Sequence, residues 1–153
     1  MDASVPRTGE QRKADVLAKL TAHHADVWVA SAPEPGPAHL VPLSLAWDGE
    51  RVIIAVEPSA VTARNIEASK TARLALGATR DVVMIDATLE GVVDAEQAPS
   101  ELADAYAAQA DWDPRVAGVP FRFYVLRPRR IQAWREVDEL AGRTVMRDGV
   151  WLF

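Results

Sequence analysis

The residues between Glu57 and Ile66 have the types and spacing that suit the binding of an anion. Ser59 or Thr62 is expected to be the N-cap of a helix, because either hydroxyl can accept a hydrogen bond from a backbone N–H of the first turn. Arg64 then falls in or near that turn, where a cation opposes the helix dipole at a cost of roughly 0.3–1 kcal/mol. A bound phosphate would make the position of this cation favourable, because free N–H groups, hydroxyls and a guanidinium would all face one dianion.

Asn65, next to this arginine, has two possible roles. It can hold the preceding loop, or it can donate a hydrogen bond to the same anion. The alternative for the whole segment is an exposed arginine on an ordinary capped helix. These residues alone are compatible with an anion site and with an ordinary capped helix, so the choice between the two depends on the surrounding sequence.

The three histidines do not form a recognisable metal site. His23 and His24 are adjacent in a predicted helix and should point in different directions, and no histidine has a partner at i+2 or i+4. His39 is isolated in a predicted strand; it is the best-placed axial ligand for a haem, although an ordinary strand histidine is the simpler explanation. Because the chain has no cysteine, thiolate zinc sites, iron–sulfur clusters and disulfides are excluded. We therefore predict no metal site.

Other polar clusters are interpreted as solvated surface. The first lies on one face of a predicted strand and consists of Asp86, Thr88, Glu90 and Asp94. The second lies in a predicted turn around Pro128 and consists of Arg127, Arg129 and Arg130. The sequence has no Ser–His–Asp order and no Walker-type glycine loop. Their absence suits a protein whose cofactor performs the chemistry, with no catalytic side chain required.

Composition restricts the compartment and the partners. The net charge of −5 opposes non-specific binding to nucleic acid. No run approaches the ~18 apolar residues of a membrane span, and residues 1–12 lack the apolar segment of a secretory signal. We expect a cytoplasmic protein with a flexible N-terminal tail at residues 1–9 and a single domain at residues 10–153.

Strands dominate the predicted elements. Alternating and apolar runs predict strands at 27–32, 39–47, 51–56, 72–76, 82–94, 121–126 and 131–134, with a last hairpin within 144–153. Helices are predicted at 10–25, 59–70 and 99–110. Asp48-Gly49 indicates a hairpin, and Pro42 places its strand at an edge or a bulge. The pattern predicts a mainly β (α+β) fold, an antiparallel barrel with peripheral helices.

The order of these features resembles the FMN-binding split-barrel superfamily, the pyridoxamine-5′-phosphate-oxidase-like proteins, including their deazaflavin-dependent reductase branch. The matching segments are VPLSLAW at 41–47, TARNI at 62–66 and ARLAL at 72–76, and the likeness extends from residue 10 to residue 134. The resemblance implies an antiparallel split β-barrel that carries FMN or, alternatively, a deazaflavin coenzyme.

It also implies a set of cofactor-binding residues. Main-chain groups of Pro42, Leu43 and Ser44 would lie beside the ring, and the phosphate would be held by Ser59, Thr62, Arg64 and Asn65. Such proteins are homodimers with both sites at the interface, so that Trp134 would cover the partner's cofactor. Many members carry a lysine where this chain has Thr62, and Arg80 is the candidate that compensates for the missing charge.

The resemblance implies an oxidoreductase that acts on a small unsaturated or heteroaromatic substrate. The alternative is a dimeric barrel that binds flavin, deazaflavin or haem without turnover. A third hypothesis, favoured only by Thr62 in place of lysine, is a degenerate barrel retained for dimerisation or partner binding.

Overall fold

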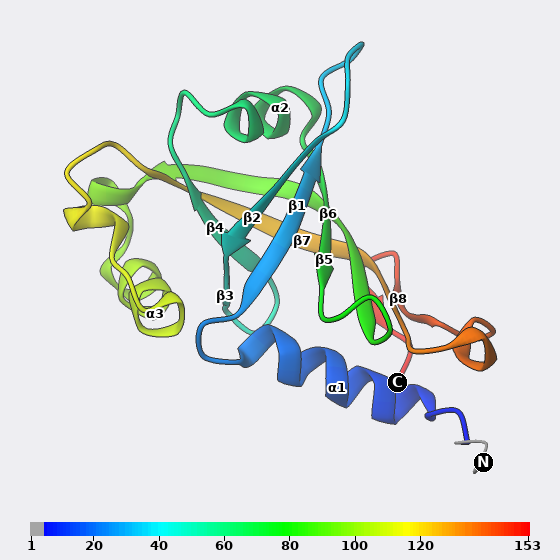
Figure 1. Cartoon of the computed structure of the whole chain (residues 1–153). Helices are drawn as coiled ribbons and strands as arrows, with labels where there is room; N and C mark the ends of the chain where they lie inside the picture. Colours follow the sequence, from blue (N-terminus) through cyan, green and yellow to red (C-terminus); the bar gives the residue numbers. More distant parts are fainter. Residues whose placement is uncertain (1–4) are drawn as a thin grey trace.

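The computed structural model describes residues 5–153 and consists of an antiparallel sheet with three α-helices around it (Figure 1). The helices are α1 (Gly9–Thr21), α2 (Val61–Ser69) and α3 (Ser100–Ala110), with short 3₁₀ helices at Ala95–Gln97, Pro114–Val116 and Val137–Glu139. The strands are β1 (Asp26–Ser31), β2 (His39–Ser44), β3 (Ala46–Trp47), β4 (Val52–Val56), β5 (Thr71–Leu76), β6 (Val82–Asp94), β7 (Arg122–Trp134), β8 (Thr144–Arg147) and β9 (Val150–Trp151).

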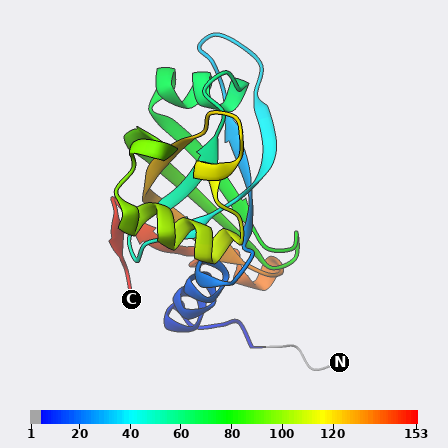
Figure 2. The same cartoon turned by 90° about the vertical axis from the view of Figure 1, so that its left-hand side faces the viewer.

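The main path of the sheet runs in the order β2-β1-β5-β6-β7-β4-β3, and β8 and β9 continue from β7. The sheet curls without closing. Pro42 lies in β2, at one end of this path, which confirms the predicted edge position. The views in Figure 1 and Figure 2 both show α1 across one end of the sheet and α2 across the other. No helix within residues 5–153 combines the length and the apolar composition needed to cross a bilayer.

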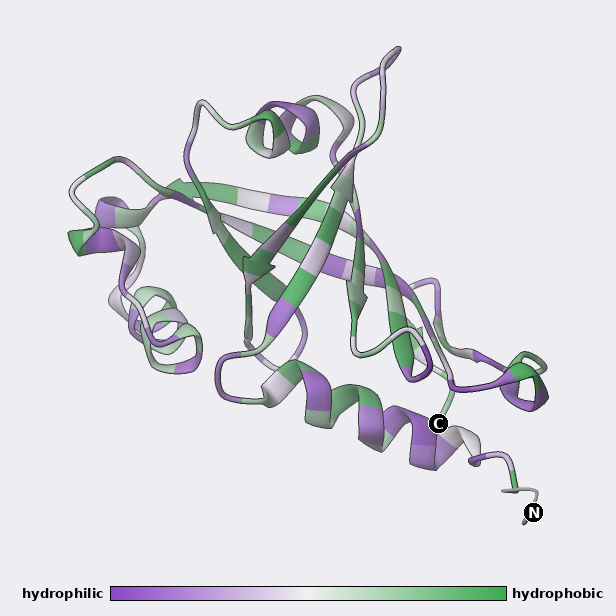
Figure 3. Ribbon diagram, viewed as in Figure 1, coloured by the Kyte–Doolittle hydropathy of each residue, from purple (hydrophilic) through white to green (hydrophobic). Residues whose placement is uncertain are grey.

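Two apolar cores hold these layers together. Figure 3 shows hydrophobic and hydrophilic residues alternating along the ribbon of α1. The larger core fills the curled sheet and is closed by Val16 and Leu20 of α1 and Ile66 of α2. The smaller core lies between α3 and the opposite face of β4 and β7, with Tyr106 at its centre and Phe123 packed on it at 5.1 Å between ring centroids. Every residue of β4 is buried because this strand has a core on both faces.

The two strands predicted at 121–126 and 131–134 are one continuous strand, β7. Pro128 pairs with Ala87 at a register shift against β6, whereas Arg130 pairs with Asp86. At a bulge the sheet does not need a hydrogen bond from every backbone N–H, so proline, which has no N–H, is tolerated there. The proline therefore bends the strand instead of ending it.

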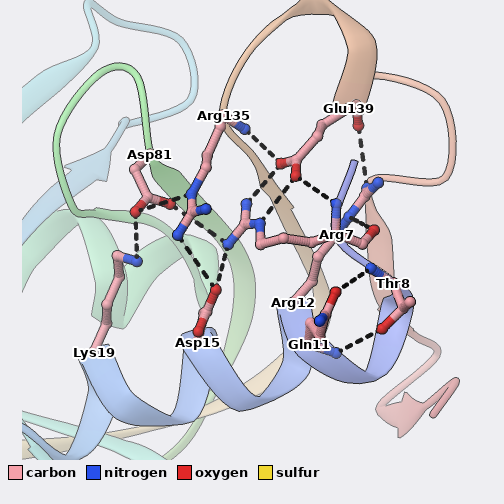
Figure 4. A network of polar contacts seen from close by, with 9 residues as sticks. All are labelled: Arg7, Thr8, Gln11, Arg12, Asp15, Lys19, Asp81, Arg135 and Glu139. Carbon is pink, nitrogen blue, oxygen red and sulfur yellow. Dashed lines mark hydrogen bonds and ion pairs between the residues drawn. The ribbon is translucent and has the colours of Figure 1, made fainter. Parts of the chain in front are cut away.

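The predicted flexible tail ended at residue 9, but the structure is ordered before that point. Thr8 and Gln11 form a reciprocal capping box, so α1 begins at Gly9. The partly buried Arg7 forms an ion pair with the buried Glu139, with 2.7 Å between Nη2 and Oε2 (Figure 4). These polar contacts hold residues 7–9 against the domain; residues 1–4 of the predicted tail lie outside the described part.

The first predicted helix extended to residue 25, but α1 ends at Thr21. His23 and His24 therefore lie in the link to β1, and His24 has a left-handed backbone with φ of 58°. Their ring centroids are 4.5 Å apart. The expectation that the two side chains point in different directions was wrong, because this turn replaces helical geometry at both residues.

Candidate functional site

The start of α2 has no side-chain cap. Its N-cap is Ala60, and neither Ser59 nor Thr62 occupies that position, which corrects the sequence prediction. The Ala60 side chain has no acceptor, so the first N–H groups of α2 have no hydrogen bond from a side-chain cap. Ser59 is exposed in the preceding turn. The helix therefore begins in the form that suits an anion.

Arg64 lies across this uncapped start. Its Nη1 donates a hydrogen bond to the carbonyl oxygen of Ser59 at 2.8 Å, and its side chain is exposed. The guanidinium is thus folded back from the first turn toward the loop before the helix. A cation in this place is unfavourable for the helix dipole and becomes favourable when an anion binds beside it.

Thr62 and Asn65 face the interior instead of this site. Their exposed fractions are 2% and 5%, and Asn65 Nδ2 donates to Ser31 Oγ at 3.3 Å. Of the two roles considered for Asn65, holding the fold is the one this contact supports. The groups available to an anion are therefore the backbone N–H groups, the hydroxyl of Ser59 and the guanidinium of Arg64.

Strand β2 carries the predicted ring-side residues, and its side chains alternate between two environments. Leu43 packs on the larger core, whereas Pro42 and Ser44 lie on the opposite side. A recess of about 490 Å³ runs along this side and is lined by β2, β1 and β5, including Pro42, Leu43 and Ser44. Because β2 is an edge strand, one row of its backbone groups has no strand partner within residues 5–153.

The same face continues across five strands. Residues that pair directly across an antiparallel sheet lie on the same face, and the register joins Pro42 to Trp28, Trp28 to Ala75, Ala75 to Met84 and Met84 to Gln132. We call the face that carries these five residues the outer face. It includes two exposed apolar side chains, Trp28 at 49% exposure and Leu40 at 60%.

Trp134 also lies on the outer face, two residues beyond Gln132 on β7 and opposite Val82 of β6. The guanidinium of Arg143 stacks over its ring at 5.7 Å from the centroid. This position is at the α1 end of the sheet. The start of α2 is at the other end, so Trp134 and Arg64 are not brought together within one chain (Figure 1).

Arg80 lies at the α1 end as well, in the loop between β5 and β6. Its Nη1 donates to Glu136 Oε1 at 2.9 Å, and its side chain is 82% exposed. The neighbouring Asp81 belongs to the ionic network with Arg7 and Lys19 that fixes this loop to α1 (Figure 4). Within one chain, Arg80 therefore does not supply the charge missing at Thr62.

The outer face also contains an ionic ladder that the sequence analysis interpreted as separate solvated residues. Asp86 accepts hydrogen bonds from Arg73 Nε at 2.6 Å and Arg130 Nε at 2.8 Å. Burial alone raises the pKa of Asp86, but the two arginines outweigh it and hold that pKa below its ordinary value. A second recess, of about 480 Å³, adjoins this ladder and includes Ser31 and Arg129. The pairing of β6 with both β5 and β7 brings these charges together.

A third recess, of about 700 Å³, lies beside Pro58 and the loop that precedes β7. Its two arginines are already engaged: Arg122 Nε donates to Asp94 at 2.9 Å, and Arg115 Nη2 donates to Asp104 at 2.8 Å. With its charges paired internally, this recess offers no free cation to a phosphate group. It is therefore a weaker candidate than the start of α2.

Comparison with known proteins supports the fold. No family model and no curated protein matches the chain. An F420 reductase structure aligns with a TM-score of 0.61 at 16% identity, over 74% of this chain and 94% of that one. An FMN-binding protein from Syntrophomonas wolfei aligns with a TM-score of 0.62 at 14% identity, over 84% and 92% of the two chains.

A haem-binding protein from Mycobacterium smegmatis aligns with a TM-score of 0.61 at 19% identity, over 95% of this chain and 60% of that one. At these identities the likeness concerns the fold alone. The chain has the antiparallel split-barrel fold with peripheral helices that the sequence predicted.

Proposed function

We propose that this split-barrel chain binds a flavin-type cofactor, FMN or alternatively a deazaflavin coenzyme, and uses it as an oxidoreductase. The observation that carries the proposal is Arg64, folded across a helix start that has no side-chain cap. An exposed cation in the first turn costs helix stability in the free protein. A phosphate beside it would turn that cost into charge-assisted hydrogen bonds.

The residues present fit such a group, although with fewer contacts than the sequence predicted. Ser59 and the first N–H groups of α2 would hold the phosphate together with Arg64. The edge backbone of β2 and the recess beside Pro42 and Ser44 would hold the ring. Thr62 and Asn65 would act indirectly, by packing α2 against β1.

The outer face supports a homodimer. Large apolar side chains such as Trp28 and Leu40 are unusual on an exposed sheet face, and a second copy would bury them. A two-fold axis that crosses the strands would place the α1 end of one copy beside the α2 end of the other. Trp134 and Arg80 would then reach the partner's cofactor, which neither residue can do within one chain.

The bound cofactor would supply hydride transfer to or from a small unsaturated or heteroaromatic substrate. The tasks of this chain would be to anchor the phosphate, to orient the ring along β2, and to exclude water with Trp28 and the partner's copy of Trp134. None of these tasks needs an acid or base side chain at the site.

The second candidate is a dimeric barrel that binds flavin, deazaflavin or haem without turnover. It is favoured by Thr62, which stands where many members of the superfamily carry a lysine and which leaves Arg64 as the main cation near the start of α2 among the described residues. For haem, His39 on β2 would be the axial ligand. Its side chain is half-buried and pairs in register with Ser31.

Absorption spectroscopy separates these candidates. The purified protein is titrated with FMN, a deazaflavin coenzyme and haemin, and any ligand carried through purification is released and identified by mass spectrometry. The proposal predicts saturable uptake of FMN or deazaflavin, followed by reduction with a hydride donor. Uptake without reduction supports the binding module, and a colourless protein that takes up none of the three contradicts both.

A further inference from the structure

The chain contains a cluster of three potential metal ligands at a place unrelated to the proposed cofactor site. We infer that His23, His24 and Asp111 form a binding site for a divalent transition-metal ion, with Zn²⁺ as the ion best suited to the ligands. One ligand atom from each residue lies within 4.8 Å of the other two. The histidines come from the link between α1 and β1, and Asp111 is the C-cap of α3.

The backbone places these side chains before any ion binds. His24 and Asp111 both have left-handed backbones, with φ of 58° and 59°. Gln109 connects their two segments. Its side-chain Nε2 donates a hydrogen bond to the carbonyl oxygen of Leu20 at 2.7 Å, and its main-chain carbonyl oxygen accepts one from the main-chain N–H of His24 at 2.9 Å. The relative position of the two turns therefore does not depend on the three ligands.

The three ligand atoms are grouped on the scale of a coordination sphere but do not yet have the spacing of bound ligands. His24 Nε2 and Asp111 Oδ2 are 2.9 Å apart, and the His23 ring stands at 76° to the His24 ring, edge to face. Zinc ligands lie about 2.0–2.2 Å from the ion, so tetrahedral ligand atoms are about 3.3–3.6 Å from one another. All three side chains are exposed, and small rotations would bring their atoms to that spacing.

The donor set indicates the class of ion. Two imidazoles and one carboxylate suit Zn²⁺ and its neighbours Co²⁺ and Ni²⁺, in contrast to the all-oxygen sites of Mg²⁺ and Ca²⁺. Three protein ligands leave at least one coordination position for water or another molecule. Because the ligands join segments 87 residues apart, an ion would also tie the end of α1 to the end of α3.

The test uses the full chain without a polyhistidine tag, stripped with a chelator and titrated with ZnCl₂ by calorimetry and with CoCl₂ by visible absorption. We expect one equivalent of Zn²⁺ to bind and one equivalent of Co²⁺ to give d–d absorption bands. Zn²⁺ should raise the melting temperature, because it binds the folded and not the unfolded arrangement. None of these readouts involves the cofactor, so the result is independent of the proposed function.

Variants His23→Ala, His24→Ala and Asp111→Asn should each weaken binding by about 10–100-fold or more, which is the scale of losing a partner of a metal site. His39→Ala is the matched control and should bind as the unchanged chain does. Circular dichroism of the metal-free variants shows that they fold. Absence of stoichiometric binding overturns the inference, as does binding that the three variants leave unchanged or that requires His24 and Asp111 but not His23.

Discussion

Arg64 Nη1 and the carbonyl oxygen of Ser59 are 2.8 Å apart, so the arginine side chain crosses the start of the helix to which it belongs. The N-cap between them, Ala60, contributes no side-chain acceptor. A cation and free N–H groups therefore share one exposed place. This arrangement is poor for an isolated helix and well suited to a phosphate.

A new cap at position 60 should have opposite effects on stability and on binding. In Ala60→Asp the carboxylate would accept from the first-turn N–H groups and raise the free energy of unfolding by about 0.5–2 kcal/mol. The same carboxylate would compete with a phosphate and weaken FMN binding. Urea unfolding and FMN titration measure the two effects, with Ala60→Gly as the control that adds no charge. Tighter FMN binding in Ala60→Asp would contradict the assignment.

The contact between Asn65 and Ser31 should be structural. Asn65→Ala leaves the buried Ser31 hydroxyl without its donor and should lower the free energy of unfolding by about 1–3 kcal/mol. Ser31→Ala in the Asn65→Ala background should cost little more, because the partner is already absent. Urea unfolding of both single variants and the double variant checks this. Additive losses would show that the two residues do not act as a pair.

The ion pair between Arg7 and Glu139 predicts a specific pH dependence. Hydrogen bonds from Arg7, opposed by burial, lower the pKa of Glu139 from 4.5 to about 2. Because the folded pKa lies below the unfolded one, the stabilisation is complete above about pH 5 and is lost as the pH falls toward 2. Its size is up to about 3 kcal/mol.

Glu139→Gln should remove most of this dependence. The variant should be less stable by about 2–4 kcal/mol at pH 7, because Arg7 loses a buried counter-ion, and the loss should shrink below pH 4. Unfolding in urea at several pH values measures both. Glu136→Gln, which changes an exposed carboxylate paired with Arg80, is the control and should follow the unchanged chain. A pH-independent difference for Glu139→Gln would contradict the assigned pKa.

The outer face predicts the oligomeric state. Trp28→Glu should give a monomer, because a charge in the centre of an apolar contact is costly to bury. Stability of the monomer itself should change little, since Trp28 is half-exposed within one chain. Light scattering after size exclusion measures the mass, with Val116→Glu, at an exposed position off this face, as the control. A monomeric unchanged chain would contradict the proposed homodimer.

Much of the fold could be predicted from the sequence, because periodicity and turn residues are local signals. β6 matches its predicted range of 82–94, and Pro42 lies in an edge strand as predicted. The errors occur where contacts between distant parts of the chain determine the local structure. A turn around Pro128 was expected to separate two strands, but the pairing of Pro128 with Ala87 at a bulge allows β7 to continue.

In the candidate site, too, local features could be predicted from the sequence, whereas features that depend on tertiary packing could not. The segment from Ser59 to Asn65 was correctly placed at the start of a helix after a strand. Which hydroxyl faces solvent could not be predicted, because packing of α2 on β1 buries Thr62 and makes Ala60 the N-cap. The approach of His23 and His24 depends on a left-handed backbone at a non-glycine residue, for which the sequence carries no clear signal.

We propose that Arg64 and the start of α2 bind the phosphate of a flavin-type cofactor. Calorimetric titration of the unchanged chain and of Arg64→Ala tests this with FMN and with riboflavin, which has the same ring and no phosphate. Arg147→Ala, which removes an exposed arginine on β8, is the control. We expect FMN to bind more tightly than riboflavin. Arg64→Ala should remove about 1.5–3 kcal/mol of that preference and leave riboflavin binding unchanged. Equal losses for both ligands, or no loss for either, would contradict it.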